Sequence, residues 1–543
     1  MSGRGLQCTG AGGRTRTDMS LRTPDFESGA YTNFATPAAN IAGKDNKSNA
    51  SRIATGGNLP PRYSMFQAPR TLPRPRSNLK RLLPTASCTC RLLYSALLRN
   101  SKLTPILASQ IERGLERGPM EEFQKLGTQI ENLWRAENYS EKVFPEIAAH
   151  ALVEADLPSR VDPWEIIRWV QSVDSLPQQF DVEGRFGNPP ITLFAGPRFY
   201  IDIYYWLDGT TSIHQHSFTG AFQVLLGSSI HSRYSFREDK IVNEHFSVGE
   251  LALAEVQLLK LKDVRMIRPG KDFIHSLFHL DRPSATVTIR TEHTPSSAVQ
   301  YDYRKPHFAL DPFFRNPVMI KKLQTIGLLL GMKHKDADAM IGDLVCSSDF
   351  QTAYFALAET YQQLQSNEMD ALFGLSTGKN RFRAILDRAR TVHGELADLV
   401  LPVLEEQERQ LSIIQRRGTI TKDAHRFFLA LLLNVPSREK ILELVKQRYP
   451  DQEPVETILD WVEELGHTRG LGSKETNALG MAEFDDSYVF VLECLLEGLD
   501  LETINQKAAA QYPPENAAEL KTKIPALMET LRESILFRSL LAD

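Results

Sequence analysis

The chain has 543 residues, of which 42% are hydrophobic and 24% charged, and its formal net charge is −4. These values are those of an ordinary soluble protein that is long enough for two or three domains. The charge is uneven: residues 1–119 carry 18 Lys and Arg against 6 Asp and Glu, whereas residues 120–543 carry 45 against 61. The acidic body disfavours nucleic-acid binding.

Membrane and disulfide classes are also disfavoured. No run approaches the roughly 18 apolar residues that a membrane helix needs. Only five cysteines occur, and they do not form the dense pattern of a disulfide framework. We therefore expect a cytoplasmic protein that binds neither nucleic acid nor a membrane.

Residues 1–119 differ from the rest of the chain. They are rich in Gly, Ser, Thr, Arg and Pro, without a lasting hydrophobic period. Such a segment cannot bury enough apolar surface to offset its chain entropy, so we expect it to be disordered. Its composition imitates a transit peptide. The stretch 24–30, PDFESGA, also resembles a spurious reading frame through a transfer-RNA gene, and we expect the native start at Met120.

The body divides by its hydrophobic period. Residues 120–178 predict helices, residues 179–312 predict short strands with Gly and Pro turns, and residues 316–543 predict helices again. The expected fold class is α+β: a small β-barrel flanked by N-terminal helices and followed by an all-α C-terminal domain. Because the period changes near residue 316, we expect the helical domain to fold apart from the barrel.

The C-terminal helical domain contains an internal duplication, at about 425–450 and 488–513. The Phe-x-Leu-x-x-Leu-Leu pattern at Phe427 recurs 63 residues later at Phe490, and each copy ends in Tyr-Pro. Helical repeats of this kind more often bind peptides or pack against a neighbour than perform chemistry. A protein partner, or self-association through these helices, is the corresponding expectation.

The central motif is a pair of histidines in the stretch 208–218, DGTTSIHQHSF. Successive side chains of a strand point to opposite faces, so His214 and His216 point the same way. Imidazoles that converge from one strand are half of a divalent-metal site. Eight of the thirteen histidines lie between His214 and His307, which strengthens the signal.

The spacing of this segment resembles the cupin superfamily, a group of jelly-roll barrels. His214-x-His216 is followed by Gly220, which stands at the family's carboxylate position, and by Gly227. The second cupin motif, a histidine after a Pro/Gly turn, is similar to the stretch 268–275, RPGKDFIH. The resemblance covers roughly residues 180–310 and implies that His214, His216 and His275 hold a metal ion.

A cupin with three histidines and no glutamate is most similar to the thiol dioxygenases, the cysteine dioxygenase family. Trp206-x-x-Gly209, followed by Ser212-Ile213-His214, strengthens that likeness. Neutral imidazoles suit Fe(II), Zn(II), Mn(II), Ni(II) or Cu(II). Without a carboxylate, the ligand set has one negative charge fewer, which favours an anionic ligand such as a thiolate. Iron is our first expectation.

Further site residues follow from the same resemblance. The family grips its substrate carboxylate with an arginine, for which Arg198, Arg185 and Arg290 are candidates, although Arg198 and Arg185 do not fall at the family's spacing. Arg290 lies inside the last predicted strand and could point inward. A tyrosine near the metal orders dioxygen in the family, which makes Tyr303 and Tyr301 candidates.

The remaining histidines are weaker candidates. His279 could be a fourth ligand, but a role beside the site or at the surface is favoured. His231 and His245 have no nearby partner in the sequence, and we expect both at the surface. Replacing either one should therefore leave metal binding unchanged.

Two functions follow. The first is a metal-dependent cupin oxygenase that uses dioxygen on a small anionic substrate. The second is a non-catalytic cupin that senses a metal or ligand and signals through its helical domain. The three histidines favour the enzyme, whereas the long helical region favours the sensor.

Overall fold

The computed structural model describes residues 119–184, 186–207, 209–292, 299–365, 378–469 and 476–541. The expectations for residues 1–118 and for Arg185 fall outside the described residues. No helix among the described ranges is both long and apolar enough to cross a membrane.

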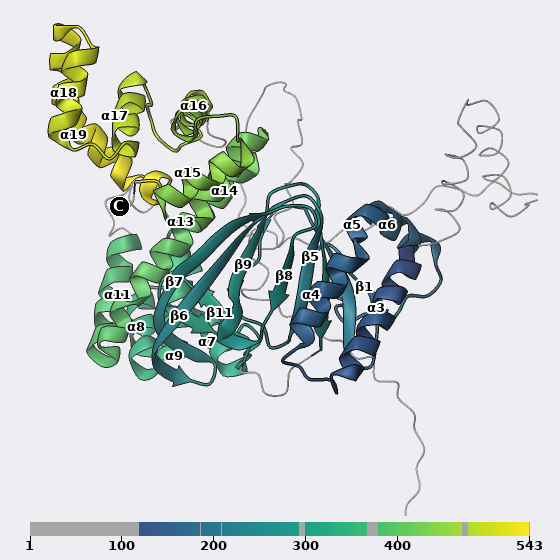
Figure 1. The fold of residues 1–543 in the computed structure, drawn as a ribbon. Coiled ribbons are helices and arrows are strands. Elements are labelled where there is room, and N and C mark those ends of the chain that lie inside the picture. The colour runs from purple at the N-terminus through teal and green to yellow at the C-terminus, as the bar shows by residue number, and fades with distance from the viewer. Residues whose placement is uncertain are drawn as a thin grey trace, which may run out of the picture. The chain divides into compact units, whose positions relative to one another are not determined.

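The N-terminal helices form a layer against the first sheet (Figure 1). Their amphipathic sequence places Trp134, Phe144 and other apolar side chains in one cluster with barrel residues such as Phe199. Asp162 begins the last of these helices by accepting a hydrogen bond from the backbone amide of Trp164, as an N-cap residue does. The helices are α3 (Pro119–Ala136), α4 (Phe144–Ala155), α5 (Leu157–Arg160) and α6 (Pro163–Ser172).

Two antiparallel sheets form the β-barrel, which has the jelly-roll character predicted from the sequence. The first sheet has the order β1 (Pro190–Ala195), β2 (Phe199–Trp206), β10 (Ser284–Thr291), β5 (Gly220–Leu226), β8 (Val264–Ile267). The second has the order β3 (Gly209–Thr210), β9 (Ile274–His279), β4 (Ile213–His214), β11 (Asp302–Arg304), β12 (Phe308–Leu310), β7 (Phe246–Leu259), β6 (Ser229–Asn243). Strand β6 also pairs with β9, and the short helix η1 (Gly270–Phe273) precedes β9.

The C-terminal region is entirely helical in its described residues. Its first helix begins where the sequence changes period, and Asn316 caps it by accepting hydrogen bonds from the amides of Val318 and Met319. The helices are α7 (Pro317–Gly331), α8 (Ala337–Ser347), α9 (Phe350–Gln365), α11 (Gly378–His393), α12 (Glu395–Asp398), α13 (Val400–Thr419), α14 (Asp423–Asn434), α15 (Arg438–Arg448), α16 (Pro454–His467), α17 (Asp486–Leu496), α18 (Leu501–Gln511) and α19 (Pro514–Glu533), followed by η2 (Phe537–Ser539). Helices α14 and α15 carry the first copy of the duplication, and α17 and α18 the second.

The barrel and the C-terminal helices share hydrophobic clusters. Ile230, Phe278 and Leu280 of the barrel belong to one cluster with helices α13 to α19. Phe246 and Phe308 belong to another with helices α7 to α13. Burial of apolar surface is the main favourable contribution to folding, so these shared clusters argue against independent folding of the two parts. Independent folding of the helical domain, which we expected from the sequence, stays a prediction.

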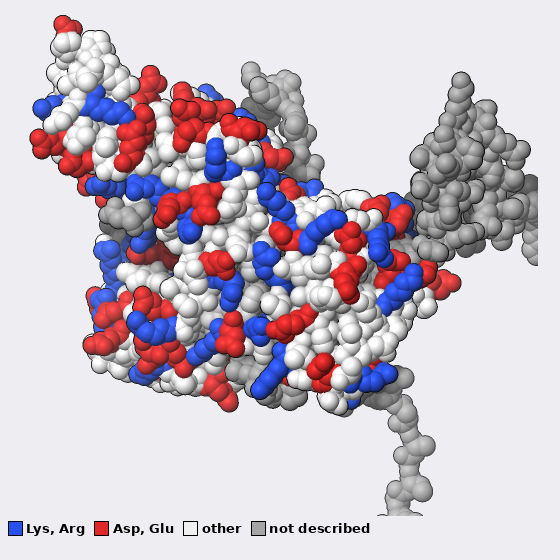
Figure 2. Space-filling view, in the orientation of Figure 1, with Lys and Arg blue, Asp and Glu red and all other residues white. Residues whose placement is uncertain are grey.

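The surface is highly charged. Figure 2 shows Lys and Arg side chains interspersed with Asp and Glu, and acidic side chains gather over α16. That helix exposes Glu456, Asp460, Glu463 and Glu464. This region contributes to the acidic balance of the body.

Candidate metal centre

Strand pairing brings the three predicted histidines together. His214 in β4 lies directly opposite His275 in β9. The strand is interrupted after His214, and His216 instead makes an isolated bridge to Pro269, just before η1. His216 nevertheless faces the same side, as the strand period predicted. All three side chains are buried, and each offers a ligand atom within 4.8 Å of the others.

The two closest ring nitrogens have a separation that suits a shared metal ion. The Nε2 atoms of His216 and His275 are 2.9 Å apart. Two nitrogens, each about 2.1 Å from one ion and at right angles, would lie about 3.0 Å apart. Three imidazole ligands on one side of an ion would leave its opposite side for other molecules.

Hydrogen bonds orient two of the three rings. Nδ1 of His214 donates to the carbonyl oxygen of Ser212 at 2.8 Å, which leaves Nε2 of His214 to accept a metal ion. Nδ1 of His275 lies 3.1 Å from Nε2 of His231. If Nε2 of His275 serves as a ligand, its Nδ1 carries the proton and donates it to His231.

The third ring is held by packing. The His216 ring lies 4.4 Å from the Phe218 ring, centre to centre. Its buried Nδ1 has no hydrogen-bond partner among the described residues. A buried polar atom without a hydrogen-bond partner is costly to the fold.

His231 corrects the sequence-based expectation. It was expected at the surface, yet only 2% of it is exposed, between the rings of Phe222 and Phe273. Residues 229–234 of β6 pair with β9, and this pairing sets His231 beside His275. The partner is 44 residues away in sequence, so spacing alone could not reveal it.

The other two histidines also have partners. His245 is half-buried rather than at the open surface, and its Nδ1 lies 2.8 Å from Oδ2 of Asp311. His279 is fully buried and stacks on Trp206, with ring centres 4.4 Å apart. Its Nδ1 lies near the hydroxyls of Ser229 and Ser284. His279 is outside the three-histidine cluster.

Burial keeps the imidazoles neutral. Removal from water lowers the pKa of His214 and holds the pKa values of His216 and His275 well below the usual value for histidine. Burial, assisted by the charge of Arg265, lowers the pKa of His231 to about 3. Neutral imidazoles have the lone pair that a metal ion requires, so the cluster needs no further deprotonation near neutral pH.

A cavity of about 260 Å³ opens beside the cluster. No Asp or Glu is among the described residues that line it, which include six aromatic side chains and five uncharged polar ones, Thr211, Ser217, Thr286, Thr288 and Gln300. Apart from the histidines, Arg290 is the single ionisable cation of this described lining. The aromatic residues of the lining are Phe186, Tyr204, Trp206, Phe218, Phe222 and Phe313.

Arg290 occupies the inward position that the strand period predicted. It lies in β10, opposite Gly220 of β5. Its guanidinium carbon sits 3.3 Å from the centre of the Phe218 ring and 5.3 Å from that of Tyr200. Its positive charge helps to lower the pKa values of His214 and His216, after the larger effect of burial. The arginine and the histidines therefore share one electrostatic environment.

Gly220 lies where two strands of the barrel approach each other closely. A Cβ atom placed on Gly220 would lie 1.9 Å from the carbonyl oxygen of Ile289. Such a contact is impossible without moving the backbone of β10. Strands β5 and β10 thus approach too closely for any side chain at the position where the cupin motif has its carboxylate.

Three other candidates lie away from the cavity. Arg198 stacks over the ring of Tyr139, 4.2 Å from its centre, and is absent from the cavity lining. The hydroxyl of Tyr303 donates to Oε1 of Gln215 at 2.6 Å, and Gln215 points to the face opposite the histidines. Tyr301 donates to the carbonyl oxygen of Glu244. The structure therefore does not bring these residues to the histidines.

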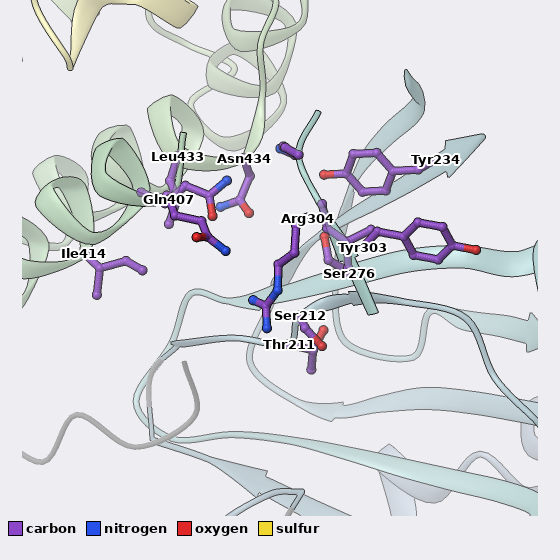
Figure 3. Close-up of a pocket in the computed structure, with 13 residues that line it drawn as sticks. Thr211, Ser212, Tyr234, Ser276, Tyr303, Arg304, Gln407, Ile414, Leu433 and Asn434 are labelled. Atoms are coloured by element: carbon purple, nitrogen blue, oxygen red, sulfur yellow. The ribbon is translucent and has the colours of Figure 1, made fainter. Parts of the chain in front are cut away.

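Tyr303 borders a second, smaller cavity of about 50 Å³, between the outer face of β4 and β9 and the helices α13 and α14. Figure 3 shows Arg304 between the Ser212 segment and the helical side chains of Gln407 and Asn434, while the Tyr303 ring points away from those helices. The two cavities thus lie on opposite faces of the strands that carry His214 and His275.

No protein-family model matches the chain, and no curated protein matches it either. Among solved structures, it is similar to a cupin-2 domain protein of Shewanella frigidimarina, at 12% identity over 25% of this chain and 99% of that chain, with a TM-score of 0.15. It is also similar to the DMSP lyase DddQ of Ruegeria pomeroyi, at 14% identity over 33% of this chain and 95% of that chain, with a TM-score of 0.18. The fold class given above rests on the strand pairings themselves.

Proposed function

We propose that this protein is a metal-binding cupin whose histidine cluster holds a divalent transition-metal ion and acts on a small anionic molecule. One observation carries the proposal: three buried, neutral imidazoles converge beside a cavity whose described lining has an arginine and no carboxylate. A divalent ion bound by neutral ligands keeps its full positive charge. Together with Arg290, that charge favours an anion in the cavity.

The residues have distinct roles in this proposal. His214, His216 and His275 hold the ion, and Ser212 and His231 orient two of these rings. Arg290 positions the anionic end of the bound molecule. The aromatic walls exclude water, which strengthens each electrostatic interaction inside the cavity.

We propose Fe(II) as the ion and oxygenation as the reaction, which gives an iron dioxygenase acting with dioxygen. The motif likeness to the three-histidine thiol dioxygenases supports this choice, as does the backbone contact that keeps a carboxylate out at Gly220. When bound, an Fe(II) ion supplies Lewis acidity and supports reactions with dioxygen. Zn(II), Mn(II), Ni(II) and Cu(II) suit the same donors.

Metal analysis followed by oxygen uptake tests the proposal. The full chain is purified without added metal, its metal content is measured, and oxygen consumption is screened over small thiols and carboxylates. We expect up to one iron per chain and consumption that requires both iron and an anionic substrate. Retention of another metal without consumption would contradict the oxygenase, and no metal retention would contradict the site.

One observation favours the second candidate, a non-catalytic sensor. Strand β9 carries His275 at its start and Phe278 near its end, and Phe278 belongs to the cluster shared with the C-terminal helices. Arg417 of α13 also lies over the Phe278 ring, 4.7 Å from its centre. Hydrogen exchange of the full chain with and without metal tests this candidate. Slower exchange in α13 and α14 on metal binding would support it, and a change confined to the barrel would contradict it.

A further inference from the structure

The lining of the larger cavity indicates the chemical class of its ligand as well as the charge. We infer that the molecule bound beside the three histidines is an aromatic carboxylate, a carboxylate group attached to a flat apolar ring. This inference deepens the proposed function, on which its placement beside a metal ion rests. The binding chemistry itself depends only on Arg290, the aromatic walls and the size of the cavity.

The carboxylate end follows from how Arg290 is held. The Phe218 ring covers one face of the guanidinium at 3.3 Å, and the Tyr200 ring lies 5.3 Å away. Stacking uses the face of a guanidinium and leaves its edge for hydrogen bonds. Nε of Arg290 donates to the carbonyl oxygen of Thr291 at 3.4 Å, so the terminal N–H groups are the donors that a ligand would use. A fixed guanidinium with donors in its plane suits the two oxygens of a carboxylate.

The apolar part of the ligand follows from the hydrogen bonds that the polar atoms of the aromatic wall residues make within the protein. Nε1 of Trp206 donates to Oγ1 of Thr286 at 3.2 Å, and the Tyr204 hydroxyl donates to Oδ2 of Asp202 at 2.9 Å. These hydrogen bonds satisfy the polar atoms within the protein. The rings of Trp206 and Tyr204 therefore line the cavity as apolar surface, as Phe218 and Phe222 do.

The size of the cavity sets the scale of the ligand. A dry apolar cavity of about 150 Å³ holds one benzene molecule, whereas this cavity measures about 260 Å³. A ring with a short carboxylate arm would fill that space. A compact amino acid such as cysteine would leave much of the aromatic surface without contact, and unfilled apolar surface contributes nothing to binding.

Charge selects against other planar ligands. An aromatic cation would meet Arg290 without any lining carboxylate among the described residues. A sugar could bond to a few polar side chains of the lining, such as Ser217, Thr288 and Gln300, but its other hydroxyl groups would face aromatic rings, where unsatisfied hydroxyl groups are costly. The anionic headgroup and the aromatic body are therefore both required.

Calorimetric titration of the metal-free full chain tests the inference with three probes. They are 3-phenylpropionate, which has both parts, acetate, which lacks the ring, and benzyl alcohol, which lacks the charge. We expect 3-phenylpropionate to bind at least about tenfold more tightly than either of the others, because its ring buries apolar area and its carboxylate pairs with Arg290. Equal affinities for 3-phenylpropionate and acetate would overturn the inference.

Two matched variants locate the binding. Arg290→Gln should weaken 3-phenylpropionate binding at least about tenfold, whereas Arg198→Gln, which removes an arginine outside the cavity, should leave it unchanged. Circular dichroism confirms that each variant is folded, and Arg290→Lys, which keeps the charge without the planar group, should give an intermediate loss if Arg290→Gln does not fold. Unchanged affinity in the folded Arg290 variants would overturn the inference.

Metal content, measured separately, distinguishes the two proposals. Binding of 3-phenylpropionate without retention of a metal ion would support this inference and contradict the proposed function. Metal binding at the three histidines together with a preference for acetate would contradict this inference and support the metal site.

Discussion

The two cavities beside β4 and β9 differ in size and in most of their lining residues, although Thr211 borders both. The inner one measures about 260 Å³ and is lined by histidines, aromatic rings and one arginine. The outer one measures about 50 Å³, has no histidine in its described lining, and is bordered by serines, amides, Arg304 and Lys305 as well as by apolar and tyrosine side chains. A single step along β9, from His275 to Ser276, passes from one to the other.

This difference teaches how much depends on the phase of a strand. Side chains alternate between faces, so a shift of one residue would exchange the contents of the two cavities. The pairing of His214 with His275 fixes that phase. Substitutions on each side of these strands therefore test whether the proposed metal site depends on the inner face alone.

The largest expected effect comes from the inner face. Replacing His214, His216 or His275 with alanine removes one of three ligands. Metal affinity should fall by more than about 100-fold, which is the largest loss usually seen when a residue that only hydrogen-bonds to a ligand is replaced. Metal content after dialysis measures it. His245→Ala, at a half-buried histidine bonded to Asp311, is the control and should retain the metal. Retention of metal by the ligand variants would refute the site.

His231→Ala should have the next largest effect. It removes the acceptor for Nδ1 of His275, so the ring loses its fixed orientation, and metal affinity should fall about 10- to 100-fold. Competition with a chelator measures the affinity. Unchanged affinity would agree with the surface position expected from the sequence and would contradict the role inferred from the structure.

Gly220→Ala tests the close approach of β5 and β10. The added Cβ would overlap the carbonyl oxygen of Ile289, so the free energy of unfolding should fall by about 1–3 kcal/mol. Denaturant unfolding measures this change. Gly331→Ala, at a glycine in α7 with open space around it, is the control. Equal stability of the two variants would mean that the strands can separate to admit a side chain.

Ser276→Ala should have the smallest effect on metal binding. Ser276 is next to His275 in the chain but lines the outer cavity. Its removal should change metal affinity by no more than about twofold, the range of substitutions at independent sites. The chelator competition used for His231 measures it. A loss as large as that of His231→Ala would show that the two faces are coupled through β9.

Local spacing predicted the parts of the site that lie on regular strands. The shared face of His214 and His216 and the inward side chain of Arg290 follow from a period of two residues, whereas His275 was identified by its resemblance to the second cupin motif. The change from strands to helices near residue 316 follows from the change of period. These features need no knowledge of which strands are neighbours.

The remaining parts depend on pairing between distant segments. His231 meets His275 only because β6 lies beside β9. Tyr303 points away from the cluster because β11 pairs with β4 in a register that places it opposite Ile213 rather than His214. The guanidinium of Arg198 stacks on the ring of Tyr139, which lies 59 residues earlier in the chain. Such registers are long-range properties that residue spacing does not encode.

The stacking of Trp206 on His279 has an optical consequence. The indole lines the inner cavity, and it is one of only five tryptophans in the chain. A molecule or ion that enters the cavity changes the surroundings of this indole directly, whereas Trp134 is buried among the N-terminal helices and Trp461 among the C-terminal helices. The difference in emission between the natural protein and Trp206→Phe would therefore report occupancy of the cavity without any added dye.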